Sequence, residues 1–324
     1  MGGMLLLAGL SATAAAALAI VLLARGQPAA RRFPVYGWIG LAAMAAFEAM
    51  LALRVAWLAT FFTAVMWTAY IAVADAAVYR RRGDSLLRRP GGFVAMAVLS
   101  VPAWLIFELY NLRLRNWAYV GVPHNFWRFS LGAAWAFATI FPGIFETADL
   151  VHCGWAQRLR SRAWRTKPRW GWAMFGAALL AAPLLAPARW APYLFAPVWA
   201  GFIFLLEPLQ RALGWPSLLA DLESGRPGRA VALLAGGAAC GFFWEFWNFW
   251  AAARWVYIFP ILHHDRVFAM PLPGFLGFPP FAIECFGLYV VLAGALLPPA
   301  WRLALLPESR VSEARAGVSH PRAC

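Results

Sequence analysis

The sequence predicts an all-α integral membrane protein with about nine transmembrane helices. Of its 324 residues, 63% are hydrophobic and only 13% are charged, and the mean hydropathy is +0.64. Water-soluble domains contain about 45–50% apolar and about 25% charged residues, so this composition excludes such a domain. The apolar residues also occur in stretches of about 20, the length that crosses the hydrocarbon core of a bilayer.

Nine candidate spans follow one another along the chain. They cover residues 4–24, 35–53, 56–78, 92–112, 133–152, 171–187, 190–206, 230–250 and 274–298. The first has no basic residues before it and is longer than the apolar core of a signal peptide, so we interpret it as a membrane helix. No connecting loop is long enough for a soluble domain, so any chemistry must take place within the helix bundle.

The basic residues predict how the helices are oriented. The chain has 28 Lys and Arg against 14 acids, a net charge of +14, which would suggest nucleic acid if it formed one surface. Instead, 21 of the 28 lie in alternate loops, which the positive-inside rule places in the cytoplasm. We therefore expect a multi-pass plasma (inner) membrane protein with its N-terminus outside and its C-terminus cytoplasmic. The basic loops would contact membrane lipid; no nucleic-acid partner is expected, and no protein partner can be named.

Two segments of the chain share one pattern of polar and aromatic residues. The first contains Glu108, Asn111, Trp117, Tyr119, Pro142 and Glu146, and the second contains Glu245, Asn248, Trp255, Tyr257, Pro280 and Glu284. The matched order indicates an internal duplication. Each copy begins on a helix that we expect to run outward and ends on one running inward, so we predict a parallel repeat of a helix-loop-helix unit.

This repeat divides the chain into four segments. Residues 1–91 form an N-terminal three-helix membrane segment, and 92–229 form the first repeat unit plus two connecting helices. Residues 230–298 form the second repeat unit, and 299–324 form a cytoplasmic basic tail.

Carboxyl groups inside the spans are the candidate catalytic residues. Seven of the 14 acids lie there, although each costs about 2.5–3.5 kcal/mol on insertion scales. The four that recur in the repeat, Glu108, Glu146, Glu245 and Glu284, are predicted to be catalytic. Where no cation lies nearby, burial should keep several of them protonated, and such an acid can donate a proton. The alternative for each Glu and Asn pair is hydrogen bonding between helices without a chemical role.

Aromatic and amide side chains around these acids predict a substrate site. Residues 242–250 are aromatic on every side of the helix, which a belt at the membrane interface does not require. Aromatic faces stabilise cations by about 0.5–2 kcal/mol each and offer a surface to a polyisoprenoid, sterol or quinone. We expect the substrate to contact Asn111, Asn248, Trp117, Tyr119, Trp244, Trp247, Trp255 and Tyr257.

No cofactor and no metal are expected. The four cysteines form no C-x-x-C pair, so they indicate neither a disulfide framework nor a zinc site. Glu146, Asp149 and His152 share one helix face and could offer metal ligands. The second copy has Gly287 and Val290 at the equivalent positions, which favours a structural role for Asp149 and His152.

The two units resemble the membrane-integral lycopene cyclase domains of the heterodimeric or fused type, over residues 92–158 and 230–298. The resemblance lies in the duplicated small helical unit and in a Pro followed by a Glu. It implies cyclisation of a carotenoid end by protonation of a double bond, with Glu146 and Glu284 as the matching acids. The chain departs from the pattern because three residues separate Pro280 from Glu284, and Cys285 replaces a second Glu. Residues 244–248 and 277–284 also resemble bacterial polytopic membrane proteins to which no activity is assigned.

The sequence thus favours a membrane-embedded enzyme that acts on a lipophilic, isoprenoid or carotenoid-like substrate. Glu245 or Glu284 would protonate an alkene or epoxide in an aromatic-lined cavity. Two alternatives remain open. The repeated carboxyls could bind the coupling ion of a proton- or cation-coupled transporter, or the aromatic surface could belong to a lipid-binding protein without catalytic activity.

Overall fold

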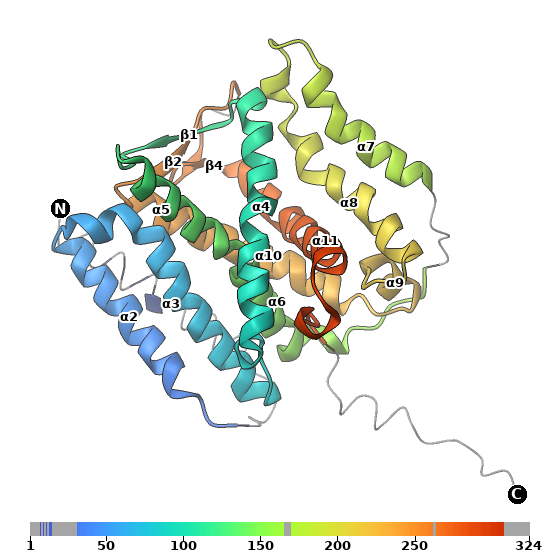
Figure 1. The fold of residues 1–324 in the computed structure, drawn as a ribbon, viewed down its shortest axis with the longest axis horizontal. Helices are drawn as coiled ribbons and strands as arrows, with labels where there is room; N and C mark the ends of the chain where they lie inside the picture. The colour runs from blue at the N-terminus through green and yellow to red at the C-terminus, as the bar shows by residue number, and fades with distance from the viewer. Residues whose placement is uncertain are drawn as a thin grey trace, which may run out of the picture.

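The computed structural model describes residues 31–164, 170–261 and 264–307, and it is mostly helical (Figure 1). Five single residues near the start of the chain are also described: Leu7, Gly9, Ser11, Thr13 and Ala14. The rest of the predicted span 4–24 and the end of the predicted tail, 308–324, lie outside the described residues.

Long helices make up most of the described chain. The α-helices are α2 (Val35–Ala52), α3 (Ala56–Arg82), α4 (Pro90–Leu114), α5 (Phe126–Ala138), α6 (Ile140–Gly154), α7 (Trp170–Leu185), α8 (Phe195–Ala212), α9 (Leu218–Glu223), α10 (Gly228–Trp250) and α11 (Phe278–Leu296). The 3-10 helices are η1 (Leu86–Arg88), η2 (Ala156–Arg158), η3 (Ala191–Tyr193), η4 (Leu272–Gly277) and η5 (Pro299–Trp301). The strands are β1 (Trp117–Val120), β2 (Arg254–Tyr257), β3 (Arg266–Val267) and β4 (Met270–Pro271).

Six segments of the described chain are long and apolar enough to cross a membrane. They are Val35–Ala52, Ala56–Arg82, Pro90–Leu114, Phe126–Gly154, Gly228–Trp250 and Leu272–Leu296. Helix α7 is apolar but shorter. The described chain therefore has the helices of a multi-pass membrane protein, and the count of nine spans stays a prediction.

Two predicted spans differ in detail from the structure. The span predicted at 133–152 falls on two helices, α5 and α6, which meet at Thr139. There the Thr139 hydroxyl donates to the carbonyl oxygen of Ala136 (2.7 Å), so the side chain competes with the helical hydrogen bonds. The span predicted at 190–206 begins later, at Phe195, because the chain first makes the 3-10 turn η3.

The helices pack in two similar groups. In the first, α2 packs on α3 and α3 packs on α6; in the second, α7 packs on α8 and α8 packs on α11. Helices α10 and α4 join the two groups, because each of them packs on α6 of the first group and on α11 of the second. Glycines permit the closest approaches, since a Cβ on Gly40 would meet the backbone of Ala69 in α3, and one on Gly176 would meet the backbone of Leu205 in α8.

An acid near the end of one helix holds the following turn in both groups. Asp75 of α3 accepts hydrogen bonds from the Ser85 hydroxyl and from the Leu87 backbone N–H, both at 2.9 Å. Glu207 of α8 accepts them from the Ser217 hydroxyl (2.8 Å) and from the Leu219 backbone N–H (3.0 Å). In each case the serine lies ten residues after the acid and precedes two leucines, so the turns are built alike.

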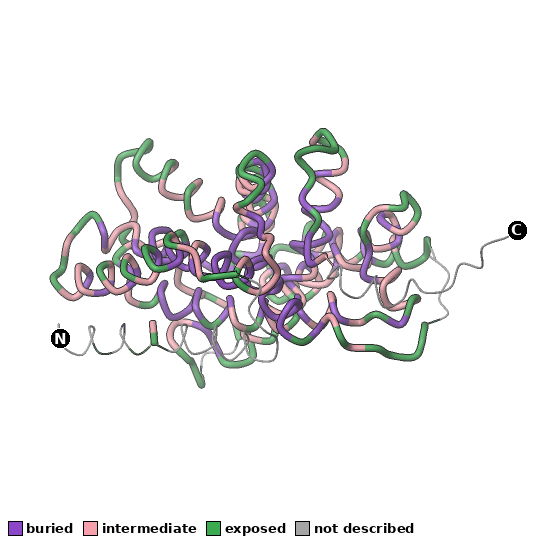
Figure 2. The backbone as a smooth tube through the Cα atoms, turned by 90° about the horizontal axis from the view of Figure 1, so that it is seen from below, coloured by how far each residue is buried: buried purple, intermediate pink, exposed green. Residues whose placement is uncertain are grey.

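Buried and exposed positions are distributed as a membrane bundle requires. Figure 2 shows that buried backbone gathers in the middle of the bundle, with exposed positions around the rim. Large apolar side chains such as Trp38, Leu109, Leu112 and Leu185 are more than half exposed. Such a surface is unusual for a water-soluble monomer and suits contact with lipid.

Candidate functional site

A cavity of about 820 Å³ lies at the end of the bundle that carries strands β1 and β2. Its volume falls within the range of about 300–1,000 Å³ that is typical of small-molecule sites. The lining comes from α3, α4, α5, α6, α8, α10, α11, η4 and both ribbon strands, and most of it is apolar. Its polar side chains include one carboxyl, that of Glu108, and the aromatic residues of the two strands.

Two asparagines hold the strands beside the ends of their helices. Asn111 of α4 accepts from the Trp117 backbone N–H (3.2 Å) and donates to the Trp117 carbonyl (2.9 Å). Asn248 of α10 does the same for Trp255, at 3.0 and 2.9 Å. Each amide therefore replaces a backbone partner at the point where the chain leaves the helix, which fixes the strand against it.

The strands pair as an antiparallel ribbon that presents four aromatic side chains to the cavity. Trp117 lies opposite Tyr257, and Tyr119 lies opposite Trp255. Because side chains alternate along a strand, these four residues share one face, and all four line the cavity. The two predicted copies thus contribute equally to one wall.

Glu108 lies behind the first strand and faces the cavity. One of its carboxyl oxygens accepts three hydrogen bonds: from Trp104 Nε1 (2.7 Å), from Trp117 Nε1 (3.3 Å) and from the Tyr119 hydroxyl (2.5 Å). Three donors that converge on one oxygen stabilise negative charge there. Glu108 is therefore an oriented hydrogen-bond acceptor in an aromatic wall.

Glu245 occupies the matching place behind the second strand, in a different environment. Its Oε1 accepts from the Tyr257 hydroxyl (2.6 Å) and from Trp255 Nε1 (3.4 Å). Its Oε2 is buried and has no hydrogen-bond partner among the described residues. An unpaired buried carboxylate oxygen is costly, so the neutral, protonated acid suits this place better than the anion.

The two environments differ because of a single helical position. Trp104 lies one turn before Glu108 and donates to it, whereas Gly241 lies one turn before Glu245. A Cβ on Gly241 would meet the ring of Phe278, so that ring packs directly on α10. The result is that Glu245 is fully buried, while Glu108 lines the cavity.

The two tyrosines of the ribbon are hydrogen-bond donors to these acids. Burial first, and then the neighbouring carboxylate, raises the pKa of the Tyr119 and Tyr257 hydroxyls well above the usual value. Both phenols therefore keep their protons near neutral pH. Tyr257 also accepts a hydrogen bond from Trp255 Nε1 (2.9 Å), which orients its hydroxyl toward Glu245.

The four predicted catalytic acids do not converge on this cavity. Glu146, Glu245 and Glu284 are fully buried and do not line it. Glu284 accepts a hydrogen bond from the Phe202 backbone N–H of α8 (3.2 Å), so it connects two helices.

The predicted substrate contacts are divided in the same way. Trp244 lines the cavity, but Trp247 does not. Trp247 packs against Trp67 and Tyr70 of α3, with ring centroids 5.0 and 5.8 Å away, so it belongs to the core. Asn111 and Asn248 act on the backbone of the strands, as described above, and not on the cavity space.

Several cavity residues fall outside the repeated pattern. Trp67 of α3, Trp104 of α4 and Trp199 of α8 all line the cavity. The spacing of Trp104 and Glu108, one helical turn apart, was a usable sequence signal. Trp67 and Trp199 had none, because only helix packing brings them to the site.

Asp149 and His152, considered above as metal ligands, have other surroundings. Asp149 forms a two-point ion pair with Arg82 of α3, at 2.6 and 2.7 Å. In the described part of the chain no group of three or more His, Cys, Asp or Glu side chains is arranged to hold a metal ion.

Comparison with known proteins gives no further assignment. No protein family, curated protein or solved structure matches the chain. The fold and the cavity therefore define the class, a multi-pass helical membrane protein with an aromatic-lined cavity, and its function rests on the site itself.

Proposed function

We propose that the protein is a membrane-embedded enzyme that acts on a lipophilic, isoprenoid or carotenoid-like substrate by proton transfer in this cavity. The observation that carries the proposal is the contrast between the carboxyl of Glu108, which lines the cavity, and that of Glu245, which is buried behind Tyr257. Glu108 receives three hydrogen bonds on one oxygen, whereas Glu245 has a buried oxygen without a partner among the described residues. Carboxyls whose surroundings favour opposite charge states are the usual arrangement of an acid and a base.

Glu245 acts as the acid in this proposal, through Tyr257. Tyr257 lines the cavity; its hydroxyl turns its hydrogen from Glu245 Oε1 to an alkene carbon, passes that proton to the carbon and accepts the proton of Glu245 in its place. The alkene π electrons form the new C–H bond, and a carbocation remains at the neighbouring carbon. Ring closure by a second double bond, or a shift of the double bond, then follows without any redox cofactor.

Glu108 and the aromatic residues stabilise that cation. The rings of Trp104, Trp117 and Trp199 line the cavity, and each aromatic face stabilises a cation by about 0.5–2 kcal/mol. Glu108 then removes a proton from the carbon next to the cation, and those C–H electrons form the new double bond. The cycle leaves Glu108 protonated and Glu245 ionised, and proton exchange with solvent restores both.

The experiment compares lipid extracts from cells that express wild type, E108Q, E245Q or E284Q together with an isoprenoid pathway. Wild type should change one isoprenoid species, E108Q and E245Q should abolish the change, and E284Q should retain it. E284Q is a matched control because Glu284 is buried but lies away from the cavity. No change with wild type, or equal activity in all four, contradicts the enzyme and favours a lipid-binding protein.

We also propose an orientation of the chain in the membrane and an internal duplication of its helices. The basic loops support an N-terminus outside, a cytoplasmic C-terminus and a place in the plasma (inner) membrane. The paired helix contacts and the matching turns at Asp75 and Glu207 support a parallel duplication that extends to the hairpins α2–α3 and α7–α8. Cysteine-accessibility mapping of single-cysteine variants in the loops 83–89 and 121–125 tests the orientation.

A further inference from the structure

Helix α5 separates the cavity from the outside of the bundle. It lies between α3 and α4 (Figure 1). Five of its residues line the cavity at the spacing of one helix face: Phe129, Gly132, Ala133, Ala136 and Phe137. None of its 13 residues, all within the described part of the chain, is buried. A single helix therefore forms the wall of the cavity on this side.

The outer face of α5 suits contact with lipid. Trp127, Leu131 and Trp135 follow one another at intervals of about one helical turn, and all three are exposed. The helix belongs to a segment, Phe126–Gly154, that is long and apolar enough to cross a membrane. Hydrocarbon and not water therefore surrounds this face, and α5 alone separates it from the cavity.

The helix that follows α5 is held in the opposite way. Every residue of α6, from Ile140 to Gly154, is buried, so packing on its neighbours fixes α6. Elements with few buried contacts are the ones that open at the lowest cost in free energy. Of the two helices, α5 is thus the one that can move without disrupting the core.

A side chain from α4 makes the joint between the two helices. The Ser100 hydroxyl accepts from the Phe141 backbone N–H (3.1 Å) and donates to the Phe137 carbonyl (2.6 Å). These two backbone groups lie four residues apart and would bond to each other in a continuous helix. A side chain inserted between them interrupts the helix and still satisfies both groups. The chain can therefore change direction at Thr139 without leaving them unpaired in the membrane.

Contacts with α3 hold the middle of α5 in place. Trp135 Nε1 donates to the Thr68 hydroxyl oxygen (3.0 Å) at an exposed position, and the Phe61 ring lies where a Cβ on Gly132 would be. At its other end, α5 is connected to β1 by residues 121–125, which belong to no helix or strand. Few contacts must therefore break for α5 to leave α3.

We propose that α5 is a gate through which a lipophilic molecule passes directly from the bilayer into the cavity. The helix turns about Thr139 away from α3, which breaks the hydrogen bond between Trp135 and Thr68, while Ser100 keeps the joint satisfied. Hinges of this kind are a few residues at the ends of elements. The gate rests on the proposed function in one respect, that the cavity binds a lipophilic ligand, and it does not depend on the proton transfer.

The test joins α5 to α3 and measures how fast the cavity fills. The variant T68C/W135C, in the full chain with C324S, is placed in lipid nanodiscs and bridged by a short bis-methanethiosulfonate, which dithiothreitol removes. Neither residue lines the cavity, and the other three cysteines are buried. The probe is geranylgeraniol, a linear isoprenoid alcohol, and native mass spectrometry follows its binding with time.

The bridge should slow binding of the probe by about tenfold or more, because the gate must open for the ligand to enter. Dithiothreitol should restore the rate, and the unbridged variant should bind at least as fast as wild type because it lacks the Trp135 hydrogen bond. The matched control is W172C/F204C, in which the reagent joins α7 and α8 at two rings 5.5 Å apart. Its bridge should leave the rate unchanged.

A second measurement needs no ligand and no bridge. Leu131 of α5 and Leu109 of α4 are both exposed, so spin labels in L109C/L131C report the position of α5 by double electron–electron resonance. This pair should give two distances in nanodiscs, one for each position of the gate. The control pair L109C/L185C, between α4 and α7, should give one.

The outcomes separate the gate from the chemistry. Equal binding rates with and without the T68C/W135C bridge, or a single distance for L109C/L131C, would overturn the gate and leave the enzymatic proposal in place. A bridge that slows binding in a protein that changes no isoprenoid would support the gate and contradict the reaction. If T68C/W135C is not monodisperse, or wild type binds no geranylgeraniol, the spin-label distances decide by themselves.

Discussion

Trp117 and Tyr257 lie directly opposite each other across the β1–β2 ribbon, and each is hydrogen-bonded to a different glutamate. The Trp117 indole donates to Glu108 (3.3 Å) and the Tyr257 hydroxyl donates to Glu245 (2.6 Å). Residues that are far apart in the sequence therefore meet at one wall of the cavity, which Glu108 of α4 lines, while Glu245 of α10 is buried behind Tyr257. This arrangement leads to four predictions.

Removing the two ribbon tyrosine hydroxyls should affect turnover unequally. Y257F leaves Glu245 with the 3.4 Å bond from Trp255 as its remaining hydrogen bond in the described structure and takes away the group that carries its proton. Loss of a positioned acid costs about 10²–10⁴-fold in rate, and we expect a decrease of that size. Y119F should retain most activity, because Glu108 keeps the bonds from Trp104 and Trp117. Product formed per unit of purified protein measures both; equal losses would contradict the assignment of Glu245 as the acid.

The two asparagines should contribute stability and not chemistry. In N111A or N248A the strand backbone loses its amide partner, and a buried backbone group left unpaired costs about 1–3 kcal/mol. Thermal unfolding in detergent should therefore occur at lower temperature, and hydrogen exchange should rise at 117–120 and 254–257. N125A is the control, since Asn125 caps the first turn of α5 at an exposed site. If N248A leaves hydrogen exchange at 254–257 unchanged, the Asn248 amide does not hold the strand.

Filling the cavity should displace its ligand. Ala136 of α5 lines the cavity, so A136W places a large ring in that space. Native mass spectrometry of protein extracted with its lipids should show bound lipophilic molecules for wild type and fewer for A136W. A42W is the control, because Ala42 is exposed on α2. Equal occupancy in all three proteins would mean that the ligand binds elsewhere.

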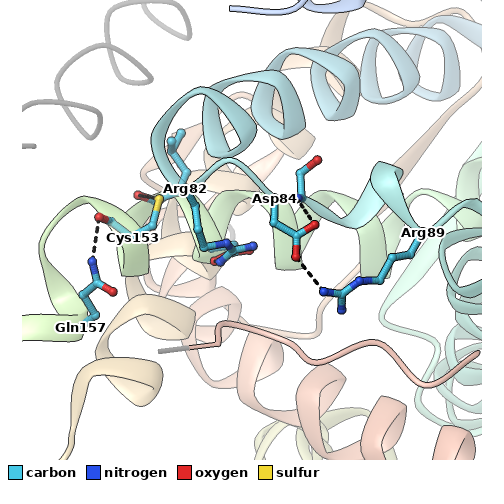
Figure 3. A network of polar contacts seen from close by, with 8 residues as sticks. Arg82, Asp84, Arg89, Cys153 and Gln157 are labelled. Carbon is cyan, nitrogen blue, oxygen red and sulfur yellow. Dashed lines mark hydrogen bonds and ion pairs between the residues drawn. The ribbon is translucent and has the colours of Figure 1, made fainter. Parts of the chain in front are cut away.

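The Arg82–Asp149 ion pair should matter far more than the neighbouring pair of Arg89 and Asp84. The side chains of Arg82 and Asp149 are 13% and 1% exposed, so R82M leaves a buried carboxylate without its cation, at a cost of about 3–5 kcal/mol. Arg89 and Asp84 are nearly half exposed, so R89M should cost about 0–1 kcal/mol. Figure 3 shows both arginines beside the same turn.

Unfolding curves of both variants in the same detergent measure the difference. The double variant R82M/D149L should recover much of the loss, since it removes the buried charge as well as the cation. If R82M and R89M unfold alike, the buried pair has no special role in stability.

The sequence was informative wherever a property depends on local pattern. The apolar stretches predicted the helices, because a membrane helix must satisfy its own backbone. The matching of Asn111 to Asn248 pointed to one shared role, and both amides bind a strand backbone in the same way. The matching of Glu108 to Glu245 was informative only in part, since both accept from a ribbon tyrosine and tryptophan but Glu108 has a further donor in Trp104. Helix ends were less predictable, as at Thr139, because a single side-chain hydrogen bond interrupts a continuous apolar run.

Contacts between distant segments were not accessible from the pattern. No sequence rule indicated that Trp67 and Trp199 would line the cavity, or that Glu146 would lie outside the cavity that Glu108 lines. The equivalence of Asp75 with Glu207 was also hidden, because different acids perform the same capping role. A signal did exist there, the serine and two leucines that follow each acid at the same distance.

The sequence by itself determined the class of protein, the approximate helices and the residues that recur. Tertiary structure decided which of those residues act together. The same pattern of residues gave, at Glu108, a carboxyl that lines the cavity with three hydrogen bonds on one oxygen and, at Glu245, a buried carboxyl with one oxygen that has no partner among the described residues. The physical reason is packing. One turn before Glu108, α4 carries Trp104, whose indole donates a hydrogen bond to the carboxyl. One turn before Glu245, α10 carries Gly241, and the Phe278 ring packs there instead of a hydrogen-bond donor.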